Sequence, residues 1–459
     1  MFKFLQNIKI RQLSNKYKQD SFKYTKLVND YRVLGEKTNW KVRPEVEAPE
    51  DNRHTYAKQL FETLVQFNKS GKAKELRTLF PPQTEPFYSL TEEKPDISNI
   101  HKIIAVSDEI FLVSIDESKF SNENNKWFFQ RNCYVYKDSM FQVLDGVGDF
   151  GICPQRKIIA FLKDDGIHLK ENWDDKSKLV LAWPQGTIYF ADGTIAAKNQ
   201  ETLKFLGDTC IPFSDGKRVL LGGFCNGLFL VDDEKTTAIF PDKQYIADYA
   251  SEDERDPLNE KDIFSHGDYS MFHFSLSHSN ELISLGHQCS SHHLYSVNGS
   301  RLGSVEPISA YPHYSLFSKD DTQACFNSCH FYNGGTLAVQ VDELKSNQLP
   351  EKQFIELDTE SRVYAGVTTS FGYIIGDAKG YIRARSYSGE HLWDDYLGFN
   401  IQTMDITADE KFLYVGTYKG ILYKIELNAG VIDLYKIGTS NNREITRWLF
   451  WEKDQIVEW

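Results

Sequence analysis

The stretch that decides the fold is YVGTYKGILYKIELNAG, Tyr414 to Gly430, near the end of the sequence. Two runs of alternating apolar residues flank Lys419-Gly420, and a second polar turn follows at Asn428-Gly430. Alternation with a period of two predicts β-strands. Gly at the second turn position favours a two-residue hairpin, because such turns require a positive φ. A single hairpin does not determine a fold, but a hairpin that recurs at a regular spacing does.

The same unit recurs along the chain as a polar turn, an apolar strand, a tight turn with Gly and a second alternating strand. We expect these tight turns at Asp165-Gly166, Asn226-Gly227, Asn333-Gly334, Lys379-Gly380 and Lys419-Gly420. The last three lie 46 and 40 residues apart, which is the length of one four-stranded propeller blade.

Two further units, residues 102–145 and 277–306, follow the same pattern and bring the total to seven. Residues 186–207 form a short stretch that could be a degenerate eighth unit. Consecutive hairpins with this period close into a ring, because radial repetition leaves no long exposed sheet edge. The sequence therefore predicts an all-β fold, a seven-bladed β-propeller with eight blades as the alternative.

The units resemble the WD40 and quinoprotein-like propeller repeats over roughly residues 100–440. Trp173-Asp174 and Trp393-Asp394 supply the Trp-Asp pair of WD40 repeats in two units, and residues 413–430 resemble a quinoprotein-type repeat. The quinoprotein resemblance implies adjacent cysteines beside a quinone cofactor. This chain has no Cys-Cys pair, so we expect no cofactor.

The first part of the chain has a different texture. Residues 1–80 are expected to be helical, since Leu60, Phe61, Leu64 and Val65 recur at helical spacing within residues 56–67. A connector that contains prolines follows at residues 81–98, and the propeller is expected to occupy residues 99–459.

Charge is distributed unevenly between these parts. Residues 1–45 contain eleven Lys or Arg and four Asp or Glu, a net charge of +7. Because the whole chain carries −13, residues 46–459 carry −20. A body that acidic repels nucleic acid and anionic lipid and attracts cationic partners, although simple solubility also explains it.

The basic start permits two interpretations. Phe2, Leu5, Ile8 and Leu13 share one side of a helix, which is typical of an amphipathic membrane or mitochondrial segment. Trp40 and other apolar residues continue the segment, however, so we favour a helical cap that docks electrostatically on the acidic propeller.

Several patterns indicate a cytoplasmic protein. No apolar run approaches the roughly 18 residues that span a bilayer, and the first residues lack the apolar block and cleavage site of a signal peptide. The seven cysteines have no regular spacing and are expected to be reduced thiols. The composition, rich in Lys, Asn, Gln, Phe and Tyr, suggests a bacterial cytosol.

Histidines cluster between positions 266 and 330, which hold eight of the twelve. The stretch HQCSSHH contains His287, Cys289, His292 and His293, residue types that suit zinc. Cys325 and Cys329 are four residues apart in an expected strand, roughly 13 Å, which is too far for one ion. We expect these histidines and cysteines to be ordinary strand and turn residues and expect no metal site.

Enzyme motifs are missing from the sequence. Gly71-Lys72 lacks the first Gly of a phosphate-binding loop, and neither a G-x-S-x-G nor an H-E-x-x-H pattern occurs. The carboxylate pairs Asp174-Asp175 and Asp394-Asp395 each follow a Trp, so blade structure explains them better than catalysis. We therefore expect a protein that is not an enzyme.

One acidic insertion interrupts the repeat, SEDERDPLNEKDIFSHGD at residues 251–268. Insertions in repeat proteins map to loops on one face, often the binding face, although a solvated loop is the simpler explanation. Its carboxylates are the candidate partner-binding residues: Glu252, Asp253, Glu254, Asp256, Glu260 and Asp262.

Together these observations predict a non-catalytic propeller that binds a basic protein, with no nucleic-acid or membrane partner. Stand-alone propellers of this kind are similar to immunity proteins of bacterial toxin systems, which implies a partner that is captured and neutralised. Two alternatives stay open: a propeller enzyme with its site at the central channel, and a scaffold subunit of a cytosolic complex.

Overall fold

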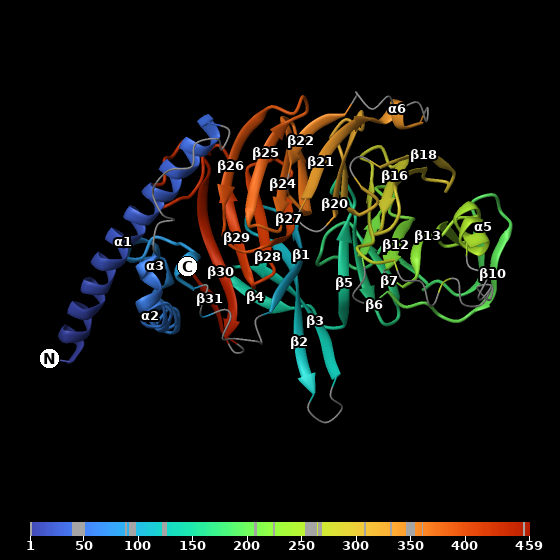
Figure 1. Ribbon diagram of the computed structural model, residues 1–459. Helices are drawn as coiled ribbons and strands as arrows, with labels where there is room; N and C mark the ends of the chain where they lie inside the picture. The colour runs from blue at the N-terminus through green and yellow to red at the C-terminus, as the bar shows by residue number, and fades with distance from the viewer. Residues whose placement is uncertain are drawn as a thin grey trace.

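The structure is a computed structural model, in which most of the chain can be described. The described residues are 2–38, 51–87, 90, 98–121, 126–205, 209–223, 225–252, 264, 269–306, 309–330, 333–345, 354–359, 361–452 and 455–459. The strands in these ranges form seven sheets, each one blade of a β-propeller (Figure 1). The predicted all-β, seven-bladed fold is confirmed.

The first three blades follow one another along the chain. Blade 1 consists of β1 (Asn99–Ala105), β2 (Phe111–Ser121), β3 (Lys126–Lys137) and β4 (Met140–Val143). Blade 2 consists of β5 (Val147–Ile152), β6 (Ile159–Lys163), β7 (Gly166–Lys170) and β8 (Leu179–Leu181). Blade 3 consists of β9 (Gly186–Phe190), β10 (Ile195–Gln200), β11 (Thr209–Pro212), β12 (Val219–Gly223), β13 (Gly227–Val231) and β14 (Thr236–Phe240).

The remaining four blades continue in order. Blade 4 consists of β15 (His273–Leu276), β16 (Leu282–Gly286), β17 (His292–Ser296) and β18 (Arg301–Val305). Blade 5 consists of β19 (Pro312–Phe317), β20 (Gln323–His330), β21 (Asn333–Gln340) and β22 (Ile355–Thr359). Blade 6 consists of β23 (Val363–Thr369), β24 (Gly372–Asp377), β25 (Tyr381–Ser386) and β26 (His391–Tyr396), and blade 7 of β27 (Ile401–Ile406), β28 (Phe412–Thr417), β29 (Ile421–Glu426), β30 (Arg443–Glu452) and β31 (Gln455–Glu458).

Blade 3 explains why there is no eighth blade. The hairpin of β9 and β10, in residues 186–207, joins the outer edge of this sheet, where β9 pairs in parallel with β14. The hairpin therefore supplies no strand to the central ring, and the alternative of eight blades is wrong.

The ring closes without strand exchange between its first and last blades. β1 packs directly against β27 and β28, and β5, β19 and β23 each pack beside the innermost strand of a neighbouring blade. Every strand of blade 1 comes from residues 99–143 and every strand of blade 7 from residues 401–458. Side-chain contacts therefore hold the two ends of the ring together.

The predicted Gly turns are confirmed at four places. Gly166 and Gly227 begin β7 and β13, Gly380 and Gly420 directly precede β25 and β29, and the four have positive φ angles of 139°, 86°, 92° and 67°. Asn333-Gly334 is a correction, because both residues belong to β21 and Gly334 pairs with Cys329. A Cβ at Gly334 would lie 2.1 Å from the carbonyl oxygen of Ser361, so glycine is needed there for close approach.

The predicted N-terminal helical region is also present. It consists of α1 (Phe2–Thr38), the 3₁₀ helix η1 (Asn52–Tyr56), α2 (Ala57–Lys69), α3 (Ala73–Leu79) and the 3₁₀ helix η2 (Glu85–Phe87). These helices share a hydrophobic core with blade 7, since Phe61 and Phe87 contact Trp451 with ring centroids 5.5 and 5.7 Å apart. The cap and the propeller thus bury one common core.

The long helix α1 lies on the outer flank of the molecule beside β26 and β30 (Figure 1). Its docking relies on neutral hydrogen bonds: the Tyr17 hydroxyl donates to the Pro81 carbonyl at 2.6 Å, and the Asn29 amide donates to the Lys436 carbonyl at 2.9 Å. Only Arg32, 3.9 Å from Asp394, forms an ion pair between the described part of α1 and the propeller. Electrostatic docking, as the charge pattern predicted, is limited to this one residue.

No helix within the described residues is both long and apolar enough to cross a bilayer. All seven cysteines fall within the described part of the chain, and each is a free thiol.

Candidate functional site

The acidic insertion begins as a helix. α5 (Lys243–Glu252) follows blade 3, so Ser251 and Glu252, which the sequence placed in a loop, are helical. The other five candidate residues lie outside the described residues: Asp253, Glu254, Asp256, Glu260 and Asp262. After them the chain returns to the body at Phe264, which is buried with its ring centroid 5.3 Å from that of Phe229. Phe264, which follows these residues in the sequence, therefore belongs to the core of blade 3.

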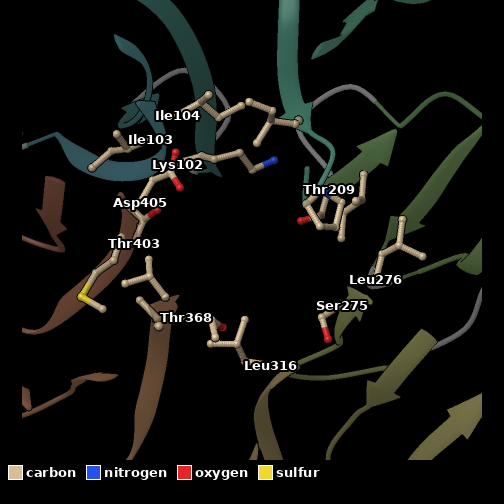
Figure 2. Close-up of a pocket in the computed structure, with 18 of the residues that line it drawn as sticks. Lys102, Ile103, Ile104, Thr209, Ser275, Leu276, Leu316, Thr368, Thr403 and Asp405 are labelled. Atoms are coloured by element: carbon tan, nitrogen blue, oxygen red, sulfur yellow. The ribbon is translucent and has the colours of Figure 1, made fainter. Parts of the chain in front are cut away.

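The central channel of the described structure holds a cavity with a volume of about 770 Å³. The innermost strand of every blade contributes to its wall. Figure 2 shows side chains that surround the open centre, among them Lys102, Thr209, Ser275, Leu316 and Thr368, with the Lys102 amino group directed inward. The channel follows from the ring of blades, and no short sequence motif predicted which residues line it.

The charged groups at one place in this wall are paired. The Lys102 Nζ lies 2.9 Å from the Asp149 Oδ2, and Arg131 donates to the same oxygen at 2.9 Å. Asp149 is completely buried, and burial by itself raises its pKa, but Lys102 and Arg131 outweigh burial and hold this pKa below its ordinary value. The cluster is therefore an ionised network that joins blades 1 and 2.

A second set of contacts crosses between blades where the innermost strands end. The guanidinium of Arg156 donates to both carboxylate oxygens of Asp405, at 2.8 and 2.7 Å, and Asp405 also accepts from the Ala105 backbone N–H at 2.7 Å. Asp405 of blade 7 thereby holds both blade 1 and blade 2. Glu410 likewise pairs with Lys319 of blade 5, which leaves this end of the channel fastened by ion pairs.

Neutral imidazoles line the channel wall beside these pairs. Burial, followed by the charge of Arg131, lowers the pKa of His101 to about 4, and burial lowers the pKa of His313 to about 4. Burial also lowers the pKa of His273 to about 3. The His313 Nε2 lies 3.0 Å from the Cys329 carbonyl oxygen and therefore carries the proton that it donates. At neutral pH these side chains are uncharged and could act as acceptors or weak bases.

The residues of HQCSSHH do not converge on one point. The ring of His287 packs among Phe240, Tyr245 and Tyr269, while His292 faces the opposite way, with its Nδ1 3.4 Å from the His273 Nε2. In the part of the chain that the structure describes, no group of three or more His, Cys, Asp or Glu could hold a metal ion.

The two Trp-Asp pairs occupy different places in their blades. Trp393-Asp394 lies in β26, the fourth strand of blade 6, whereas Trp173-Asp174 lies in the connection between β7 and β8. Asp394 accepts from Arg385 at 2.7 Å, and Asp175 accepts from Asn172 at 2.8 Å. The two pairs are therefore not at equivalent positions in their blades, although Asp394 and Asp175 each accept a hydrogen bond within their own blade.

The sequence did not indicate the ionised residues in and beside the channel wall. These residues lie in or beside strands whose sequences show only ordinary alternation: Lys102, Arg131, Asp149, Arg156 and Asp405. A charged residue at an expected strand position is the one available signal, because a buried charge requires a partner. The sequence does not indicate which partner it meets.

The comparisons with known proteins add little to this description. No protein-family model matches the chain, and no curated protein matches it. Among solved structures, the chain is similar to "KlHsv2 with loop 6CD replaced by a Gly-Ser linker", with 8% sequence identity and a TM-score of 0.42 over 77% of this chain and 99% of that chain. A likeness of this size assigns neither a family nor a function. The propeller architecture follows from the seven sheets themselves.

Proposed function

We propose that this protein is a binding propeller that captures a basic protein partner and neutralises it, as an immunity protein does to a toxin. A propeller is consistent with a protein-binding scaffold. The observation that carries the finer proposal is the charge of −20 on residues 46–459, together with the acidic sequence between α5 and the buried Phe264. Such a body steers a cationic partner toward it.

The chemistry of the channel supports binding over catalysis. Lys102 faces Asp149 at 2.9 Å, Arg156 faces Asp405 at 2.7 Å, and Lys319 pairs with Glu410. A charged group that is held in an ion pair is a poor general base or nucleophile, because its proton affinity is fixed by its partner. These pairs instead tie the blades into a rigid platform for a partner.

The acidic segment is the proposed contact, and four substitutions test it. Glu252→Ser, Asp253→Asn, Glu254→Ser and Asp256→Asn together should leave the melting temperature nearly unchanged, since they lie outside the blades. The rate of association with the partner should fall, and raising the salt concentration should slow the wild type steeply, because exposed charges are screened beyond ~8 Å.

The partner for this test comes from co-purification with the tagged protein in its native host, followed by identification and purification of the captured protein. The proposal is supported if the captured protein has a basic surface and is toxic to cells, and if co-expression of the propeller protein relieves that toxicity. If the quadruple variant binds and protects as well as the wild type, the acidic segment is not the contact. If no captured protein is basic, the partner assignment fails.

A second candidate, a propeller enzyme, is favoured by one observation: His101, His273 and His313 line a cavity of about 770 Å³ with their imidazoles neutral. Imidazoles that line a cavity can accept a hydrogen bond from a bound substrate, although pKa values of about 3 to 4 make them weak bases at neutral pH. For an enzyme, His313→Gln should abolish turnover of a substrate that enters the channel. For a binding propeller, the same variant should capture the partner as the wild type does.

A further inference from the structure

The helix α1 turns its cationic side away from the propeller. Residues 2–38 contain nine Lys or Arg and three Asp or Glu, a net charge of +6 within a chain of −13. The docked side is formed by Ser14, Tyr17, Thr25 and Asn29, which donate to carbonyl groups of other segments. Lys9, Lys23 and Lys26 are exposed and lie away from this side, where they can meet another surface.

Few of the described α1 cations have a partner on the body of the protein. Arg32 lies 3.9 Å from Asp394, and the amino group of Lys16 lies 4.6 Å from the ring centroid of Tyr56. Lys26 pairs with Asp30 of its own helix at 2.5 Å. Lys9, Arg11 and Lys23 are exposed. Docking consequently leaves most of the positive charge available.

Large apolar side chains are exposed beside these cations. Phe22, Leu27, Val33 and Leu34 of α1 are 36–43% exposed. The connection between β29 and β30 adds Ile432, which is 86% exposed, and Leu434, which is 60% exposed.

This connection lies against the middle of α1. Thr25 and Asn29 donate to the carbonyl groups of Tyr435 and Lys436, at 3.3 and 2.9 Å. The helix and the connection are therefore neighbours, and we use the name α1 flank for the exposed residues of α1 together with Val431, Ile432 and Leu434.

We propose that the α1 flank docks the protein on an anionic lipid membrane. The lysines and arginine of α1 would contact headgroup phosphates, while Ile432, Leu434 and Phe22 would enter the boundary of the acyl layer. The helix would lie along the surface, since no described helix is long and apolar enough to span a bilayer. Its 37 residues extend over ~55 Å at 1.5 Å per residue, a length that a flat lipid surface can contact throughout.

The lipid surface fits better than an acidic protein for a physical reason. Ile432 and Leu434 are 86% and 60% exposed, and a protein partner would need a preformed pocket for each. An acyl layer deforms around protruding side chains and requires no matching pocket.

The expectation of no membrane partner came from the average charge of the body. Charges that lie farther apart than ~8 Å are largely screened at physiological salt, so the acidic blades away from α1 do not cancel its lysines. The inference is independent of the proposed capture of a basic protein. The quadruple variant of the acidic segment should bind vesicles as the wild type does.

Vesicle co-sedimentation of the full-length chain tests the proposal. We expect binding to phosphatidylcholine vesicles that contain about one-third phosphatidylglycerol, weak binding to pure phosphatidylcholine, and loss of binding at high salt. Ile432→Ser with Leu434→Ser should lower the partition coefficient at least about tenfold. Lys9→Gln, Arg11→Gln and Lys23→Gln together should lower it at least as much.

Matched controls lie elsewhere on the surface. Met140→Ser with Val143→Ser removes two apolar side chains of β4 that are 58% and 60% exposed, and Lys198→Gln, Lys217→Gln and Lys235→Gln remove three exposed cations of blade 3. Both controls should bind vesicles as the wild type does, and thermal melting should show that every variant is folded.

Three results would overturn the proposal. Equal partitioning into neutral and anionic vesicles would remove the role of the cations, and an equal loss of binding in the controls would remove the role of the α1 flank. Binding to soluble polyglutamate without binding to vesicles would assign the α1 flank to an acidic protein instead.

Discussion

Asp405 illustrates how a single side chain can close a ring. Its carboxylate accepts from the Arg156 guanidinium at 2.8 and 2.7 Å and from the Ala105 backbone N–H at 2.7 Å. It belongs to blade 7, while its partners belong to blades 2 and 1. Since no strand is exchanged between the first and last blades, this carboxylate replaces part of the backbone hydrogen bonding that a shared blade would supply.

The first prediction tests this role. Asp405→Asn should lower the free energy of unfolding by about 2–4 kcal/mol, because it leaves a largely buried guanidinium without its charge partner. Urea denaturation measures the change. The control is Asp215→Asn, whose ion pair with Arg218 is about one-third exposed on both sides, and which should change stability by less than about 0.5 kcal/mol. Equal effects of the two substitutions would show that the Asp405 contacts do not close the ring.

At the scale of elements, the helical cap protects the outer edge of blade 7. The strand β31 has no further strand beside it in the described sheet, and an open edge invites pairing with another chain. Asn68 of α2 meets this edge twice: its side-chain amide donates to the Glu458 carbonyl at 2.9 Å, and its side-chain oxygen accepts from the Glu458 N–H at 2.8 Å. Phe61 and Phe87 pack against Trp451 behind it. The cap is therefore part of the propeller core.

The second prediction concerns this shared core. Phe61→Ala should destabilise the protein by about 3–5 kcal/mol, because Phe61 is buried between α2 and blade 7 and its removal leaves a cavity. Thermal or urea unfolding followed at a tryptophan signal measures the change. Lys58→Ala, on the exposed side of the same helix, should be close to neutral. A loss below about 1 kcal/mol for Phe61→Ala would indicate that the cap contributes little to the core.

At the scale of the whole molecule, buried and half-buried histidines are distributed through blades 1, 4 and 5. His101, His273, His293 and His313 are all neutral in the folded protein, with pKa values lowered to about 4, 3, 3 and 4. Burial is the largest cause in each case. An unfolded histidine takes up a proton near pH 6.5, so acid favours the unfolded chain.

The third prediction is the resulting pH dependence. Because the folded pKa values lie below the unfolded value, the stabilisation is fully present above about pH 6.5 and is lost as the pH falls toward about 4. Each buried histidine adds up to about 1.4 kcal/mol per pH unit to the slope in this window. Urea unfolding between pH 8 and 4 measures it, and His313→Gln should make the slope shallower by about one histidine's share. A stability that stays constant from about pH 7 to 5 would contradict the prediction.

The propeller could be predicted from sequence because its signals are local. Strand alternation and a Gly with positive φ, as at Gly380 and Gly420, involve neighbouring residues only, and their regular spacing implies a ring. The same local rule failed at Asn333-Gly334, where glycine serves a close backbone approach to Ser361 in place of a turn. The rule also did not decide whether residues 186–207 form an eighth blade. A hairpin has the same sequence pattern at the edge of an existing sheet and in a new blade.

Only the tertiary structure shows which charged residues of the candidate sites pair with each other. Arg156 and Asp405 are 249 residues apart in sequence, and only closure of the ring brings them together. Net charge is a property of the sequence, so the acidic body and basic start could be read directly. The side on which α1 docks could not be predicted from the sequence. The carbonyl partners of this side are brought into place only when the whole chain has folded, and they accept from Ser14, Tyr17, Thr25 and Asn29. Local patterns fix strands and turns, whereas the pairing of buried charges and the orientation of a docked helix depend on contacts between distant residues.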